Sequence, residues 1–103
     1  MNENESIEFK ENYTEKIYKE IIAFLNTNSG TIYIGYDDNG NLIGVDNCKD
    51  IEEKISNGIR TNIYPDARIF VSINTGKIED KEYIIIKVSK GIDIYYLKEK
   101  GIV

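Results

Sequence analysis

The chain of 103 residues can form one compact domain with a modest core and is too short for two. Hydrophobic residues make up 41% and charged residues 30%, with a formal net charge of −5, which is a globular balance and excludes a disordered or fibrous chain. The single cysteine, Cys48, excludes an internal disulfide framework and a cysteine-rich zinc site, and the absence of histidine excludes serine–histidine and cysteine–histidine catalysis.

The first half of the chain predicts a strand, a helix and a β-hairpin. Residues 6–10 alternate apolar and polar side chains, as in a half-buried strand. Apolar residues then recur at helical spacing over residues 14–26, with Thr14 in the N-cap position. Residues 31–36 form a β-branched and aromatic strand, and Asn39-Gly40 is typical of a type I′ turn that leads into a return strand over residues 41–45.

The second half predicts a helix followed by strands. A capping box begins at Asp50, the apolar stripe continues through this helix, and Pro65 ends it. Gly58 inside the helix costs about 1 kcal/mol relative to alanine. Strands follow over residues 68–74 and 83–89, a turn over residues 76–81 joins them, and residues 94–97 start another strand. The order predicts an α+β fold in one domain over residues 1–103, with two helices and a mainly antiparallel or mixed sheet.

Two features of the chain bear on its location. Its apolar runs are far shorter than the roughly 18–20 residues of a membrane span. The first residues carry acids where a signal peptide would carry lysines, which predicts a cytoplasmic protein with no membrane partner. The apolar end after Lys100 has no polar stop signal, so we expect the chain to be the N-terminal part of a longer protein.

Charge is distributed unevenly along the chain. Residues 1–53 hold 4 basic and 12 acidic side chains, whereas residues 54–103 hold 9 basic and 6 acidic ones. A basic face built from the second half would suit a phosphate backbone, and tyrosines between the lysines would stack an unpaired base. A solvated sheet face with no ligand is the alternative explanation. The candidate nucleic-acid-binding residues are Lys10, Arg60, Arg68, Lys87, Lys90 and Lys98.

Acidic residues of the first half form a second candidate site. If the first strand pairs with the hairpin, Glu8 approaches Asp37 or Asp38, together with Glu3 or Glu5. Clustered carboxylates hold a hard cation such as Mg²⁺ or Mn²⁺, which activates water and neutralises a phosphate. The alternative is that the aspartates serve the turn and that the glutamates are solvated.

Several blocks of sequence, taken in order, resemble the Schlafen AlbA-type domain. Residues 5–11 read Glu-Ser-Ile-Glu-Phe-Lys-Glu, and residues 23–35 run from Ala-Phe-Leu-Asn-Thr-Asn-Ser-Gly into Thr-Ile-Tyr-Ile-Gly. Asp-Asp-Asn-Gly over residues 37–40 and Ile43-Gly44 follow, and residues 95–101 fit the C-terminal portion. The ordered set spans nearly the whole chain and is more specific than any one block.

The resemblance implies a nucleic-acid-binding domain of the kind found at the N-terminus of larger bacterial transcriptional regulators. The main hypothesis is therefore a DNA-binding domain of such a regulator, without a cofactor, whose partners are nucleic acid and the remainder of the parent chain. Animal members of the family include metal-dependent ribonucleases that cut transfer RNA with three carboxylates, which implies the triad Glu3, Glu8 and Asp38 here, with Glu5 able to replace Glu3. A Mg²⁺- or Mn²⁺-dependent endoribonuclease with these residues is the enzymatic alternative. A module that forms homo-oligomers through a sheet edge is the structural alternative.

Overall fold

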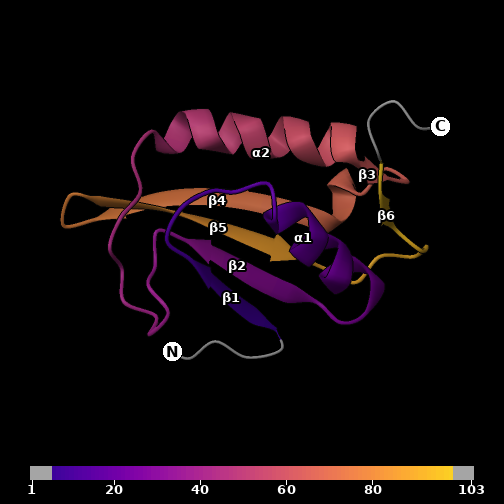
Figure 1. Ribbon diagram of the computed structural model, residues 1–103, viewed down its shortest axis with the longest axis horizontal. Coiled ribbons are helices and arrows are strands. Elements are labelled where there is room, and N and C mark those ends of the chain that lie inside the picture. Colours follow the sequence, from indigo (N-terminus) through magenta and orange to yellow (C-terminus); the bar gives the residue numbers. More distant parts are fainter. Residues whose placement is uncertain (1–5, 99–103) are drawn as a thin grey trace.

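The backbone forms a four-stranded mixed sheet with two helices on one face and a separate two-stranded ribbon (Figure 1). The computed structural model describes residues 6–98. In chain order the elements are β1 (Ile7–Lys10), α1 (Ile17–Asn26), β2 (Gly30–Ile34), α2 (Cys48–Asn62), β3 (Ile63–Tyr64), the 3-10 helix η1 (Arg68–Phe70), β4 (Val71–Ile78), β5 (Lys81–Val88) and β6 (Tyr96–Leu97). The predicted α+β fold is confirmed.

The strand order in the main sheet is β1-β2-β5-β4. Strand β1 pairs with β2 in parallel, while β2 with β5 and β5 with β4 are antiparallel, so the sheet is mixed. The pairing of β1 with β2 is the one on which the sequence-based sites depended. The ribbon pairs β3 with β6 next to the C-terminal end of α2.

The core lies between the sheet and the two helices. Strands β2 and β5 bury Ile32, Ile34, Ile84 and Ile86 completely, and the register places all of them on one face. They join one buried cluster with the apolar stripes of both helices, which include Ile21 of α1, and Ile55 and Ile59 of α2. Each such side chain contributes about 1.5–3 kcal/mol through its removal from water. Apolar residues recur with a period of 2 in the strands and of 3.6 in the helices, and this recurrence accounts for the core between the sheet and the helices.

Both helices begin at other residues than the sequence predicts. Helix α1 starts at Ile17, because residues 14–16 form a tighter turn in which the Ile17 amide donates to the Thr14 carbonyl at 3.2 Å. Thr14 is therefore not the N-cap. Helix α2 starts at Cys48, after Asn47 in the left-handed conformation, so Asp50 lies within the first turn and does not cap it.

The type I′ turn lies in a different hairpin from the predicted one. Of the pair Asn39-Gly40 only Gly40 has a positive φ, and the turn is stabilised by the Asp37 carboxylate, which accepts the amide of Asn39 at 2.9 Å. The predicted return strand is reduced to a single bridge opposite Tyr36. Positive φ at two successive residues, as type I′ requires, occurs at Glu79 and Asp80 between β4 and β5.

The second half also departs from the predicted strand limits. Residues 68–70 form η1, and β4 then runs to Ile78 through Gly76, a residue assigned to the turn by the sequence. A Cβ at Gly76 would overlap the ring of Tyr83 on β5, so glycine leaves room for that ring. The predicted final strand is confirmed as the short β6.

Candidate nucleic-acid interface

One face of the main sheet carries neither helix, and it is called the open face below. It is defined by the strand positions that alternate with the buried ones. These positions are Ile7, Phe9, Thr31, Tyr33, Ser72, Asn74, Gly76, Ile78, Lys81, Tyr83, Ile85 and Lys87. Along these four strands, all within the described residues, the open face includes two lysines and no acidic residue, although acids outnumber bases in the chain by 18 to 13.

Aromatic rings form a cluster in the middle of the open face. Phe9 of β1 lies 5.7 Å from Tyr33 of β2 and 6.1 Å from Tyr36, measured between ring centroids. Tyr36 also contacts Tyr33 at 5.3 Å and Tyr83 of β5 at 6.3 Å. Phe9 is buried, whereas the three tyrosines are partly exposed. Burial, together with the neighbouring tyrosines, raises the pKa of Tyr36, so its hydroxyl stays neutral near pH 7.

This cluster is the feature that the sequence analysis missed. The tyrosines interleaved with the basic residues at the C-terminal side, Tyr95 and Tyr96, are not on the open face: Tyr95 is buried against Phe70, and Tyr96 packs on Tyr64. The signal that was available is the alternation in β2 and β5, in which every second residue except Ile85 is aromatic, polar or basic.

The structure distributes the predicted cations over three regions. Lys87 lies on the open face, and Lys90 follows β5, where its amide donates to Ser29 Oγ. Lys10 lies on the helix-covered face, where its Nζ is 2.8 Å from the Glu20 carboxylate of α1. Lys10 and Lys87 are therefore on opposite faces of the sheet.

The remaining predicted cations lie on the elements at the C-terminal end of α2. Arg60 belongs to the last turn of this helix. The backbone amide of Lys98 donates to the carbonyl of Asn62, which places Lys98 at the same end, where Figure 1 shows β3 and β6. Arg68 in η1 pairs with Asp66 at 2.7 Å, and this contact lowers the pKa of Asp66 to about 2. An ion-paired arginine is less available to a phosphate than an unpaired one.

Only part of the predicted carboxylate site belongs to the described residues 6–98. Glu8 aligns with Ile32 and therefore lies on the helix-covered face, and Asp38 is an exposed residue of the turn after β2. Glu3 and Glu5 lie outside the described residues. Within residues 6–98 no group of three or more Asp, Glu, Cys or His side chains is placed to hold a metal ion.

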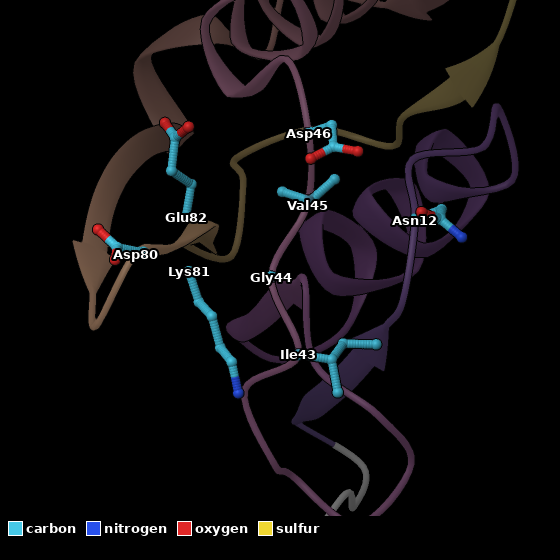
Figure 2. A pocket seen from close by; sticks show the side chains of 8 residues that line it. All are labelled: Asn12, Ile43, Gly44, Val45, Asp46, Asp80, Lys81 and Glu82. Atoms are coloured by element: carbon cyan, nitrogen blue, oxygen red, sulfur yellow. The ribbon is translucent and has the colours of Figure 1, made fainter.

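A second group of acids borders a small cavity of about 270 Å³ beside the β4–β5 hairpin. Its lining includes Asp46, Asp80, Glu82 and Lys81. Figure 2 shows that the three carboxylates point away from one another, so they do not converge on a common cation. This cavity has the wrong charge for a nucleic-acid backbone.

Comparison with known proteins gives the family of the chain and a solved structure with a similar fold. The family model "Schlafen, AlbA_2" matches residues 3–103, and the chain belongs to this family. Among solved structures, the DIP2311 protein from Corynebacterium diphtheriae is similar, with a TM-score of 0.66 and 18% identity over 88% of this chain. The match covers 19% of that protein, so this chain spans about a fifth of its length. No curated protein matches the chain. Within residues 6–98, no helix combines the length and the apolar character needed to cross a membrane.

Proposed function

We propose that this domain binds nucleic acid across the open face of its sheet, and that in a longer protein it is the DNA-binding part of a transcriptional regulator. One observation carries the proposal: partly exposed tyrosine rings and Lys87 lie on a strand face that has no acidic residue. Membership of the Schlafen AlbA_2 family supports the nucleic-acid ligand.

The chemistry of the open face favours an unpaired segment of the ligand. A base stacks on a tyrosine ring only when it has left its own stack, and such a contact contributes about 1–3 kcal/mol per base. Tyr33 and Tyr83 are partly exposed, and the buried ring of Phe9 supports Tyr33 from β1. Lys87, on β5 beside Tyr33, is positioned to contact a phosphate next to the stacked base.

The net charge of −5 gives no long-range attraction for a polyanion. Binding therefore depends on the local composition of the open face. Acids of the described chain are carried by the helices, the turns and the helix-covered side of the strands, of which Glu8 and Glu82 are examples. The expected affinity is modest and decreases with salt.

The test is a titration of labelled single-stranded DNA and RNA of one sequence, followed by fluorescence anisotropy at two ionic strengths. Tyr33→Leu keeps an apolar neighbour for Phe9 and removes the stacking ring, so we expect an affinity loss of about fivefold or more. Lys87→Gln should weaken binding and reduce the log–log salt slope by about 0.7, the value for one phosphate contact on a single strand.

Lys77→Gln is the matched control, because Lys77 lies on the helix-covered side of β4 and its Nζ is 3.8 Å from Asp80. It removes the same charge and should leave binding unchanged. The absence of association at low salt, or equal effects of the two lysine variants, would contradict the proposal. Tighter binding to RNA than to DNA would contradict only the regulator role.

A further inference from the structure

A cavity of about 430 Å³ lies at one end of the open face, where β2 begins and β5 ends. Its polar lining includes Ser29, Thr31 and Ser89, and the only charged residue among those that line it is Lys87. Tyr33 of the aromatic cluster completes the wall on the side of the stacking surface. Apolar groups such as Ile7 and Val88 share the lining with these hydroxyls and the one positive charge, and none of the described residues that line the cavity carries a carboxylate. Among the described residues, the polar part of the lining therefore favours an anion.

Four of these residues, which we call the grid, border the cavity from both strands. Thr31 and Lys87 are direct partners on the open face, while Ser29 immediately precedes β2 and Ser89 immediately follows β5. Neighbouring strands are about 4.8 Å apart and alternate residues about 6.8 Å apart. Four donors at such spacings can each reach a different oxygen of one tetrahedral anion.

The hydrogen bonding of Ser29 and the lack of a carboxylate partner for Lys87 within the described chain favour an anion at these residues. Ser29 Oγ accepts the backbone amide of Lys90 at 3.2 Å, and among the described residues no acceptor is found for its own proton. A hydroxyl that already accepts one hydrogen bond can donate its proton to a ligand. Within the described chain Lys87 has no carboxylate partner, in contrast to Lys10, which pairs with Glu20.

The size of the cavity indicates what carries the anion. Binding pockets for small organic ligands begin at about 300 Å³, and this cavity lies within that range, so it has room for more than one phosphate group. The ring of Tyr33 lies at its wall and presents a stacking surface for a base.

From this geometry we infer that the cavity binds the phosphate group of a nucleotide, with Lys87, Ser29, Thr31 and Ser89 as donors, while the attached base stacks on Tyr33. The inference rests on the proposed function and assigns a particular site within the open face. Thr31 and Lys87 are on strands and the two serines lie directly beside the strand ends, so the site does not depend on a helix N-terminus. The phosphate can belong to the end of a strand or to its backbone, and the test separates these sources.

The test compares three ligands: a short labelled oligonucleotide with a 5′-phosphate, the same oligonucleotide with a 5′-hydroxyl, and a nucleoside 5′-monophosphate. The double variant Ser29→Ala/Ser89→Ala removes two donors and should reduce affinity about tenfold or more for each ligand that uses the cavity. The matched control is Ser72→Ala, since Ser72 flanks Lys87 on the same face from β4 but does not line the cavity.

A loss confined to the 5′-phosphate ligand supports a terminal phosphate, and an equal loss for both oligonucleotides supports a backbone phosphate. If the double variant binds all three ligands as Ser72→Ala does, the inference is overturned, while effects of Tyr33→Leu and Lys87→Gln would still support the proposed function. If no oligonucleotide binds, the proposed function fails, and only the nucleoside monophosphate tests the cavity. Binding of the monophosphate that the double variant loses would support the inferred phosphate site. No binding of the monophosphate would overturn the inference. Thr31→Val keeps the shape of Thr31 and removes one donor, so it should reduce the affinity several-fold for each ligand that uses the cavity. This variant replaces the double variant in the test if the double variant does not fold.

Discussion

The contact between the two helices gives a sharp prediction about stability. In an exposed helix, replacing Gly58 with alanine stabilises by about 1 kcal/mol. Here a Cβ on Gly58 would overlap the hydroxyl and the ring of Tyr18, a buried residue of α1. Overpacking of this kind costs about 1–3 kcal/mol. The Tyr18 hydroxyl also hydrogen-bonds Tyr13 at 2.9 Å and donates to the Lys54 carbonyl at 3.3 Å, and displacing it weakens both contacts.

Each of those hydrogen bonds contributes about 1 kcal/mol. The overpacking and the weakened hydrogen bonds together outweigh the gain in helix propensity, so Gly58→Ala should lower the free energy of unfolding by about 1–3 kcal/mol. For a domain of this size that corresponds to a melting temperature lower by about 5 °C or more. Burial, together with the hydrogen bond to Tyr13, raises the pKa of Tyr18, so its hydroxyl keeps its proton throughout the assay.

The measurement is thermal and urea unfolding followed by circular dichroism. Ser56→Ala is the control, because Ser56 is exposed on the same helix and its replacement gains about 0.5 kcal/mol from helix propensity alone. Combining Gly58→Ala with Tyr18→Phe removes the nearest clashing atom, so the double variant should lose less than the two single losses together. A Gly58→Ala protein as stable as the original would refute this account of the helix contact.

Three further predictions concern titration, reactivity and catalysis. The hydrogen bonds from Arg68 lower the pKa of Asp66 to about 2, so an NMR titration should find its midpoint there, and Arg68→Gln should return it towards the ordinary value of 3.8. Because the folded pKa is the lower one, this contact stabilises the fold above the ordinary pKa of 3.8, and the contribution is lost as the pH falls towards 2. Burial raises the pKa of Cys48, so iodoacetamide should label the native protein slowly at pH 8 and the urea-unfolded protein rapidly; rapid native labelling would contradict this. Glu8→Gln should leave oligonucleotide affinity unchanged, because Glu8 faces the helices; Mn²⁺-dependent cleavage of transfer RNA that this variant loses would favour the endoribonuclease instead.

Alternation in the sequence predicts the strands well and their orientation poorly. Residues 6–10 do form a strand with Ile7 and Phe9 on one side, yet this side is the open face and not the core between sheet and helices. The polar side is tolerated under α1 because β1 is an edge strand, where Lys10 reaches the Glu20 carboxylate. A period of 2 defines which residues share a face, but only the tertiary packing decides which face the helices cover.

Turns and caps were the least predictable elements, because several local sequences compete for the same conformation. Asn39-Gly40 favours type I′, but Asp37 provides an alternative by accepting backbone amides, and Gly35 with a φ of 99° interrupts β2 just before it. Glu79 and Asp80, which carry no such signal, adopt positive φ because the long pairing of β4 with β5 leaves two residues for the connection.

The register of β5 connects the stability of this domain with its proposed site. The same alternation that buries Ile84 and Ile86 against the helices presents Tyr83 and Lys87 on the open face, and a slip of one residue would exchange the two sets. The buried isoleucines oppose such a slip, since each would lose about 1.5–3 kcal/mol on exposure. The core therefore fixes the position of the proposed stacking and phosphate-binding side chains without using them, which explains why Tyr33→Leu and Lys87→Gln are expected to change binding while leaving the fold intact.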